Sequence, residues 1–265
     1  MTRYLIDAQH MCLDVPIFQP SARKLLSHPG RLLSDLYLTR AKRNAVTLLD
    51  DINLQLEPGD RVGIIGTNGA GKSTLLKVLA GVYPISRGSL AINGAAKGLF
   101  NISLGMNMEG TGLENIYLRG LQMGLTLDEV RDLVEEVVKF AELTEAIDRP
   151  INTYSTGMLL RLAFAISTMI HPDILLLDEW IGAGDIRFRQ KAQDRMNELV
   201  DRSRCLVLAT HNASLMKRLC PRGIVVDQGK IVFDGPIDDA QGYYEEKIVS
   251  TTPAASDLPK PIPRT

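Results

Sequence analysis

The fold of this chain is restricted chiefly by a glycine-rich loop with the pattern GxxxxGK[ST]. The loop reads Gly66-Thr67-Asn68-Gly69-Ala70-Gly71-Lys72-Ser73-Thr74. An apolar strand, Val62–Ile65, precedes it and a predicted helix, Ser73–Ala80, follows it, which is the context that a phosphate-binding loop requires. Glycines let the backbone curl so that successive N–H groups and the helix N-terminus point at an anion. The loop therefore predicts a phosphate site in which Lys72 meets the β and γ phosphates and Ser73 offers its hydroxyl to Mg2+.

Two carboxylates, Asp178 and Glu179, come directly after the short apolar strand Ile174–Leu177. In an open parallel sheet, the carboxyl ends of the strands form the edge where ligands bind. We expect Asp178 to hold Mg2+, directly or through water, because this ion prefers oxygen ligands and keeps several waters. We expect Glu179 to orient and deprotonate the water that attacks the γ phosphate. On its own the pair also fits two solvated carboxylates in a turn, so this interpretation depends on the phosphate loop.

The apolar patterns predict a parallel-sheet core with a helical insertion at about 105–170. Strands are predicted at Leu48–Leu56, Arg61–Ile65, Ile174–Leu177 and Cys205–Ala209, and helices at Thr126–Leu143, Met158–Ile170 and Arg187–Arg202. Residues 19–43 mix basic side chains with leucines, which fits an amphipathic insertion in the first sheet and equally a solvated surface loop. Residues 250–265 hold four of the 13 prolines and are predicted to form a disordered tail.

Composition and charge exclude several classes of protein. The chain is 45% hydrophobic and 23% charged, which excludes a disordered or collagen-like chain. Its 30 basic and 31 acidic residues give a net charge of −1, so no nucleic-acid partner is expected. The three cysteines lack CxxC spacing and predict neither a zinc site nor a disulfide framework. The longest nearly apolar stretch, Leu162–Ile170, is about half of what a bilayer requires, and no leader-like apolar segment begins the chain, so we expect neither a membrane span nor secretion.

The order of these motifs resembles that in the nucleotide-binding subunits of ATP-binding cassette (ABC) transporters. The segment Tyr154-Ser155-Thr156-Gly157-Met158 is similar to the family's signature motif, which lies immediately before a helix. The resemblance implies that Ser155 and Gly157 meet the γ phosphate held by a second copy, in a head-to-tail dimer. Gly184-Asp185 resembles the end of the D-loop, and His211 resembles the switch histidine that hydrogen-bonds the γ phosphate. Taken alone, the signature segment is also a plain helix N-cap, and a lone histidine has many structural roles.

The resemblance implies an α/β fold of the P-loop NTPase (RecA-like) type. It has a mixed-sheet core, an antiparallel β subdomain and an inserted α-helical subdomain, which together form one nucleotide-binding domain over residues 1–249. The implied activity is ATP hydrolysis, with ATP and Mg2+ as ligands. The nucleotide-binding residues are then Gly66, Asn68, Gly69, Ala70, Gly71, Lys72, Ser73, Thr74, Ser155 and Gly157. The metal-binding residues are Ser73 and Asp178, the catalytic residues are Glu179 and His211, and Asp185 belongs to the D-loop.

A narrower resemblance is to the subfamily that exports bacterial surface polysaccharides. It rests on Gly112–Leu118, Tyr154–Met158 with Arg161–Ala165, and Asp173–Glu179 with Gly184-Asp185. It implies a peripheral subunit on the cytoplasmic face of the bacterial inner (plasma) membrane. This subunit would drive an integral-membrane permease, contacted through Gly98–Gly124, that moves a lipid-linked polysaccharide of O-antigen, capsule or teichoic-acid type. Another type of ABC exporter, and a soluble ABC ATPase that acts on ribosomes or DNA, stay open as alternatives because cassette motifs do not encode the cargo.

Three departures from the family pattern are visible. Residues 40–50 contain no aromatic side chain, where the family usually places one against adenine; Tyr37 is a distant candidate. No glutamine lies between Leu99 and Asn107, where the coupling loop normally has one, and Asn101 and Ser103 are the polar alternatives. The roughly 20 residues after Tyr244 are too few for a carbohydrate-binding β-sandwich, so we expect glycan recognition to rest with the permease.

Overall fold

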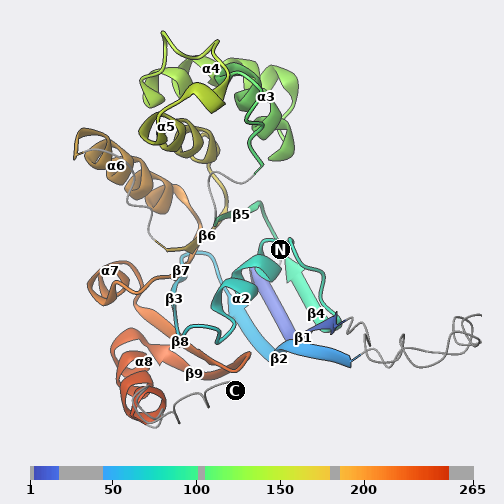
Figure 1. Ribbon diagram of the computed structural model, residues 1–265. Helices are drawn as coiled ribbons and strands as arrows, with labels where there is room; N and C mark the ends of the chain where they lie inside the picture. The colour runs from blue at the N-terminus through green and yellow to red at the C-terminus, as the bar shows by residue number, and fades with distance from the viewer. Residues whose placement is uncertain (1–2, 18–43, 101–104, 180–185, 251–265) are drawn as a thin grey trace, which may run out of the picture.

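The computed structural model describes residues 3–17, 44–100, 105–179 and 186–250, which form two sheets flanked by helices (Figure 1). The strands are β1 (Ile6–Ile17), β2 (Asn44–Leu56), β3 (Arg61–Ile65), β4 (Arg87–Ile92), β5 (Ala96–Leu99), β6 (Ile174–Asp178), β7 (Cys205–Ala209), β8 (Arg222–Asp227) and β9 (Lys230–Pro236). The helices are α2 (Lys72–Leu79), α3 (Gly112–Gln122), α4 (Leu127–Ala141), α5 (Thr156–Ser167), α6 (Ile186–Arg202), α7 (Ala213–Leu219) and α8 (Ile237–Tyr243), followed by a π-helical turn (Tyr244–Val249).

The larger sheet has six strands in the order β5-β6-β7-β3-β8-β9. Neighbouring strands run parallel except for the hairpin of β8 and β9, which is antiparallel. Strands β3, β6 and β7 are buried almost along their whole length, because helices or the second sheet cover both of their faces. Continuous apolar strands are what a doubly covered parallel sheet requires, and the predicted strands 61–65, 174–177 and 205–209 are confirmed.

The smaller sheet is antiparallel, with the order β2-β1-β4. Its β2 begins at Asn44, four residues before the predicted strand, and ends at the predicted Leu56. Strand β1 was not predicted from the sequence. Its pairing with β2 changes register around Met11 and Leu13, and such bulges interrupt the strict alternation by which a strand is recognised.

In the helical part of the chain, α3 and α4 each begin with a capping box. The Thr111 hydroxyl accepts the Glu114 N–H, and the Glu114 carboxylate accepts the Thr111 N–H. Thr126 and Glu129 repeat this arrangement at the start of α4. The predicted helix at 126–143 is therefore confirmed, with its end at Ala141 because Glu142 adopts a left-handed cap with φ of 58°. The helix predicted at 158–170 is α5, shifted to 156–167.

A cluster of three phenylalanines joins this helical part to α6. The rings of Phe140 in α4, Phe164 in α5 and Phe188 in α6 have centroids 5.6 to 5.9 Å apart. Two of the three pairs meet edge to face, a geometry that aromatic quadrupoles favour. Because the three rings are at most 9% exposed, they pack α4, α5 and α6 into one unit.

Buried side chains form two clusters on opposite faces of the six-stranded sheet. Leu175 and Leu177 of β6 belong to the cluster that includes the helical part. Ile174 and Leu176 of the same strand belong to the other cluster, with β1, β2 and α2. Because successive side chains of a strand point to opposite faces, the one apolar run of β6 contributes to both cores. The mixed sheet with helices on its faces confirms the P-loop NTPase fold that the sequence predicted.

A substitution at Gly120 tests the contact between α3 and α4. A Cβ atom at Gly120 would lie 2.4 Å from Cγ2 of the buried, β-branched Val130. We expect Gly120→Ala to lower the free energy of unfolding, since overpacking costs about 1 to 3 kcal/mol and exceeds the helix gain of about 0.5 to 1 kcal/mol. Urea unfolding measures the change. The matched control is Gly242→Ala in α8, where a Cβ meets no atom within 4 Å; a stability loss as large as that of Gly120→Ala would refute this packing account.

Several sequence predictions fall outside the described residues. They are the insertion at 19–43 with Tyr37, the coupling-loop candidates Asn101 and Ser103, the D-loop residue Asp185, and the tail after Ser250. Within the described part of the chain, no helix is both long and apolar enough to cross a bilayer.

Candidate functional site

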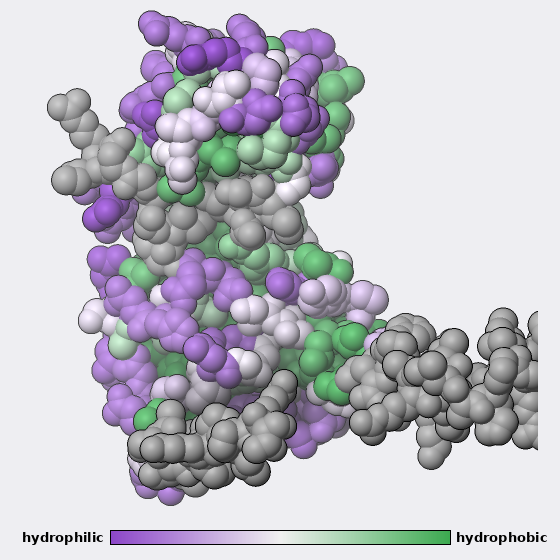
Figure 2. All heavy atoms as spheres, viewed as in Figure 1, coloured by the Kyte–Doolittle hydropathy of each residue, from purple (hydrophilic) through white to green (hydrophobic). Residues whose placement is uncertain are grey.

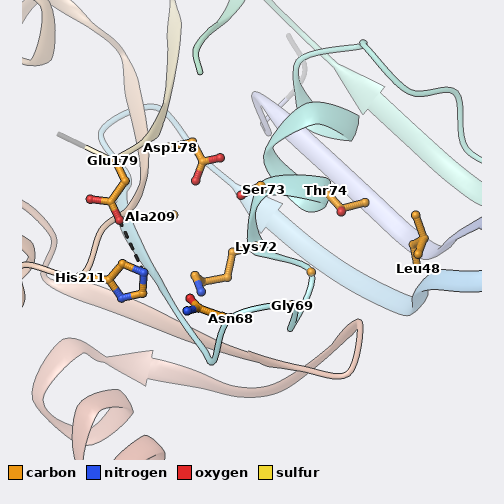
Figure 3. Close-up of a pocket in the computed structure, with 11 residues that line it drawn as sticks. Leu48, Asn68, Gly69, Lys72, Ser73, Thr74, Asp178, Glu179, Ala209 and His211 are labelled. Atoms are coloured by element: carbon orange, nitrogen blue, oxygen red, sulfur yellow. Dashed lines mark ion pairs between the residues drawn. The ribbon is translucent and has the colours of Figure 1, made fainter. Parts of the chain in front are cut away.

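Three neighbouring strands of the larger sheet end at one edge, and each is followed by residues that the sequence marks as functional. The glycine-rich loop follows β3, and His211 follows β7. Asp178 is the last residue of β6, and Glu179 comes directly after it. Because β6, β7 and β3 are adjacent and parallel, these groups converge on one cavity of about 400 Å3 (Figure 3). The cavity is lined by Leu48, Asn68, Gly69, Gly71, Lys72, Ser73, Thr74, Asp178, Glu179, Ala209 and His211.

Two glycines of the loop meet requirements that other residues do not. Gly71 caps α2 with φ of 112°, a left-handed conformation that favours glycine. A Cβ at Gly66 would lie 2.3 Å from the backbone oxygen of Val226 in β8, so the loop must leave β3 without a side chain. Ala70 is 4% exposed, and its carbonyl accepts the Gly229 N–H at 2.8 Å. Close packing of Gly66 against β8 and the hydrogen bond at Ala70 therefore fix the curl of the loop.

The ammonium group of Lys72 lies inside the curl of the loop. Its Nζ donates hydrogen bonds to the carbonyl oxygens of Gly66, at 2.7 Å, and Thr67, at 2.9 Å. Partial burial lowers the pKa of the Lys72 ammonium, while the negative charges of Asp178 and Glu179 act in the opposite direction. A cation in this position, bonded to loop carbonyls and near two carboxylates, gives the cavity the charge distribution needed for an anionic phosphate with an associated metal ion.

Glu179 is held by contacts from the segment that follows β7. Its N–H donates to the carbonyl of Ala209 at 2.8 Å, which continues the pairing of Asp178 with Ala209. One carboxylate oxygen, Oε1, lies 3.7 Å from Nε2 of His211, as the dashed line in Figure 3 shows. The other, Oε2, accepts a long hydrogen bond of 3.4 Å from the Thr210 hydroxyl. Glu179 has φ of 76°, and strained backbone of this kind is concentrated at functional sites.

The cavity also contains oxygen atoms suited to Mg2+. The Ser73 hydroxyl and the Asp178 carboxylate both line it. Among the described residues, no three His, Cys, Asp or Glu side chains gather in a way that could hold a metal. This donor set fits Mg2+, which usually takes one or two protein oxygens together with substrate phosphates and waters.

Four of the predicted nucleotide-binding residues do not line this cavity: Gly66 and Ala70, which belong to the loop itself, and Ser155 and Gly157, which lie in the helical part. Ser155 caps α5 by accepting the Met158 N–H at 3.2 Å, and a Cβ at Gly157 would meet no atom within 4 Å. Both residues are exposed, and neither lines the cavity formed by the loop. The structure therefore brings Asn68, Gly69, Lys72, Asp178, Glu179 and the other lining residues together, and leaves Ser155 and Gly157 at an open helix N-terminus of the helical part.

The structure adds residues that the sequence did not indicate. Leu48 of β2 lines the cavity beside the loop, so an aliphatic side chain occupies part of the region for which the sequence offered no aromatic. Behind the loop, a smaller cavity of about 150 Å3 is lined by Thr210 and His211 and by Gln241 and Tyr244 near the end of the described chain. Leu48 belongs to the smaller sheet, and the packing of that sheet beside the loop brings it to the cavity. Thr210 directly precedes the predicted histidine, and that adjacency is the one signal that pointed to it.

The comparisons with known proteins agree with this arrangement. Residues 49–182 match the sequence profile of the family described as ABC transporter. The O-antigen export system ATP-binding protein RfbE of Yersinia enterocolitica is 37% identical over 84% of this chain and 94% of its own length. RfbB of Myxococcus xanthus, also named an O-antigen export system ATP-binding protein, is 40% identical over 83% of this chain. The teichoic acids export ATP-binding protein TagH of Bacillus anthracis is 37% identical over 84% of this chain.

The matched region covers different shares of these relatives. It spans 51% of RfbB and 40% of TagH, so the chain corresponds to about half or less of those two proteins. Among solved structures, an ATP-binding subunit of an ABC transporter has a TM-score of 0.63 and 20% identity, with 91% of this chain and 93% of that chain covered. A dimeric ATP-binding cassette bound to ADP and Pi has a TM-score of 0.62 and 19% identity, with coverage of 88% and 98%. At these identities the structural likeness shows the fold alone.

Proposed function

Since this chain belongs to the ABC transporter family, we propose that it binds and hydrolyses ATP to drive export of a lipid-linked surface polysaccharide through a separate permease. The observation that carries this proposal is the convergence of the phosphate loop, Asp178, Glu179 and His211 on one cavity. The names of the relatives, which refer to export of O-antigen and teichoic acids, support a polysaccharide of O-antigen, capsule or teichoic-acid type.

In the proposed reaction, the loop amides and the α2 N-terminus bind the β and γ phosphates of ATP. Lys72 exchanges its bonds to the loop carbonyls for bonds to phosphate oxygens. Glu179 accepts a proton from the water that attacks the γ phosphorus, as the bond from that phosphorus to the bridging oxygen breaks and ADP leaves. His211 hydrogen-bonds the γ phosphate. Ser73 and Asp178 hold Mg2+, which when bound neutralises charge on the phosphate oxygens.

A second copy of the chain completes the site in this proposal. Ser155 and Gly157 stand at an exposed helix N-terminus, outside the cavity of their own chain. A helix N-terminus favours anions through free N–H groups and the helix dipole. In a head-to-tail dimer, this end of α5 meets the γ phosphate bound to the partner's loop. The dimeric state of a solved cassette with the same fold is consistent with this arrangement.

The proposed permease contact is the segment from Gly98 to Gly124, which includes α3 of the helical part. Among its described residues, Met108, Leu118 and Leu121 are 37 to 45% exposed. Figure 2 shows hydrophobic side chains on the outer surface of the helical part, above the sheets. Exposed apolar residues that gather on one surface are typical of a protein interface. Docking there would hold the subunit at the cytoplasmic face of the inner (plasma) membrane.

A charge placed on this surface tests the permease contact. We expect Leu121→Glu to reduce recovery of the permease with the tagged subunit by about tenfold, because burying an unpaired carboxylate in an apolar interface is costly. ATP hydrolysis by the isolated subunit should change little. The measurement is quantitative mass spectrometry of detergent-solubilised membranes. The matched control is Leu127→Glu, at a leucine of α4 outside the segment that is 56% exposed, against 45% for Leu121. Equal recovery of the permease with both variants would contradict the proposed contact.

Export itself is tested by identifying what accompanies the subunit in its native cell. We expect the tagged chain, solubilised with ATP and Mg2+, to copurify in stoichiometric amount with one polytopic membrane protein. Deleting the subunit should remove the polysaccharide from the cell surface while its lipid-linked form accumulates inside. A permease whose loss leaves surface polysaccharide unchanged would contradict the cargo. Recovery with ribosomes, nucleic acid or soluble proteins alone would contradict the exporter.

A further inference from the structure

Thr210 connects Glu179, the proposed base, to the segment that carries His211, which contacts the γ phosphate in the proposed function. It follows β7 directly, and its side chain is buried, with 9% of the residue exposed. Its Oγ1 lies 3.4 Å from Oε2 of Glu179 and 3.2 Å from the backbone nitrogen of Asn212. Thr210 therefore contacts the carboxylate on one side and the loop that carries His211 on the other.

The direction of both hydrogen bonds follows from the groups involved. A backbone N–H is a donor, so the Thr210 oxygen must accept from Asn212. The hydroxyl proton is then left for the other neighbour, and an ionised carboxylate can only accept. The hydroxyl of Thr210 thus points at Oε2 of Glu179 whenever that carboxylate is charged, which is the state in which a base accepts a proton.

The contact matters because Glu179 is held weakly by its other neighbours. Its side chain is 56% exposed, and its backbone is in the left-handed region. Among the described residues, the other side chain in contact with the Glu179 carboxylate is that of His211, with Nε2 3.7 Å from Oε1. If His211 turns to the γ phosphate, as the proposed function requires, Thr210 is the remaining side chain in contact with the carboxylate.

We propose that Thr210 is a positioning residue, whose hydroxyl directs the Glu179 carboxylate at the attacking water while His211 is engaged with the γ phosphate. This inference rests on the proposed function of Glu179. The loop geometry supports it further, because Asn212 is itself anchored by accepting the Leu215 N–H at 3.0 Å at the start of α7. The Thr210 hydroxyl is therefore fixed to a helix rather than to a free loop.

The primary test replaces Thr210 with valine, which keeps the shape and removes the hydroxyl. We expect the hydrolysis rate at saturating Mg2+ and ATP to fall about tenfold, since misplacing a catalytic group by a fraction of an ångström to 1 Å costs up to about 100-fold. The KM for ATP should change by less than about twofold, because Thr210 touches no phosphate in this proposal. Thr210→Ser, which keeps the hydroxyl, should stay within about threefold of the wild-type rate. A Thr210→Val enzyme as fast as the wild type, or one that loses ATP affinity in proportion to its rate, would overturn the proposal.

The matched control is Thr168→Val at the end of α5. Thr168 is also buried, and its hydroxyl donates to the carbonyl of Phe164 at 2.8 Å, far from the cavity. This variant shows what losing a buried threonine hydroxyl costs in general, and its rate should match that of the wild type. Thermal unfolding of all variants checks the fold, and Thr210→Ala, which should be as slow as the valine variant, provides a second measurement. If Thr168→Val slows hydrolysis as much as Thr210→Val, the effect is not specific and the proposal is wrong.

A double-mutant cycle separates failure of this inference from failure of the proposed function. In a Glu179→Gln background, Thr210→Val should slow single-turnover hydrolysis by less than about twofold, because the group on which it acts is already lost. The same tenfold loss in both backgrounds would show that Thr210 acts elsewhere. A Glu179→Gln enzyme as fast as the wild type would overturn the base assignment, and a slow Glu179→Gln enzyme with a fast Thr210→Val enzyme would overturn the positioning role alone.

Discussion

Replacing Glu179 with glutamine is expected to slow ATP hydrolysis by about 10²- to 10⁴-fold, the usual contribution of a general base. The amide keeps the size of the side chain and one of its two acceptor oxygens, but it accepts no proton from water at neutral pH. ATP binding should persist, because the loop, Lys72 and Ser73 are unchanged. The variant should therefore accumulate as an ATP-bound dimer, which size-exclusion chromatography with and without nucleotide detects directly.

The control for this variant is Glu135→Gln on the exposed face of α4, which removes the same charge far from the cavity. It should hydrolyse ATP at the wild-type rate and remain monomeric between turnovers. Phosphate release at the wild-type rate by Glu179→Gln would show that another group accepts the proton. A slow variant that stays monomeric with ATP would keep the base and contradict the head-to-tail dimer.

The second large effect is expected at Lys72. Lys72→Ala should lower kcat/KM for ATP hydrolysis by about 10²- to 10³-fold or more, the size of effect seen when one preorganised donor to a developing charge is removed. It differs from Glu179→Gln because ATP affinity should fall as well, since the ammonium neutralises phosphate charge in the bound state. Titration with a fluorescent ATP analogue and a steady-state phosphate assay measure the two quantities separately.

Lys77→Ala is the matched control, because Lys77 lies in the last turn of the same helix, α2. Its Nζ stands 5.9 Å from the ring centroid of Tyr83 rather than in the phosphate loop. Removing this charge should leave ATP affinity nearly unchanged. Equal loss of ATP affinity in the two variants would mean that general charge on α2, rather than the position of Lys72 in the loop, attracts the nucleotide.

The parts of the fold that could be predicted are those whose local pattern determines their structure. β3, β6 and β7 are short apolar runs bounded by turn residues, and α4 carries a capping box, so each was recognised with ends correct to within a few residues. β1 could not be recognised in this way, because His10 adopts φ of 49° and the strand is irregular there. Its partners lie at 44–56 and 87–92, so the pairing depends on contacts distant in sequence.

In the candidate site, too, residues in local motifs could be predicted and residues placed by distant contacts could not. Lys72 and Asp178 stand in recognisable motifs at strand ends, and the carboxyl edge of a parallel sheet was sufficient to predict their meeting. The place of His211 was predicted only from the resemblance to the family. Leu48 could not be predicted as a lining residue, because its place depends on how the smaller sheet packs beside the loop. The link between Thr210 and Glu179 also could not be predicted, since it depends on the direction of one hydroxyl in a buried position.

The division of the apolar side chains between two cores has a consequence for the dynamics of the molecule. β6 contributes to both clusters through alternate residues, so neither cluster can open fully without exposing one face of this strand. Elements that belong to a single cluster, such as α3 and α4, can open locally at a lower free energy. Glu179, Asp178 and the phosphate loop thus follow strands that belong to both clusters, while α3, which lies in the proposed permease contact, can fluctuate without displacing them.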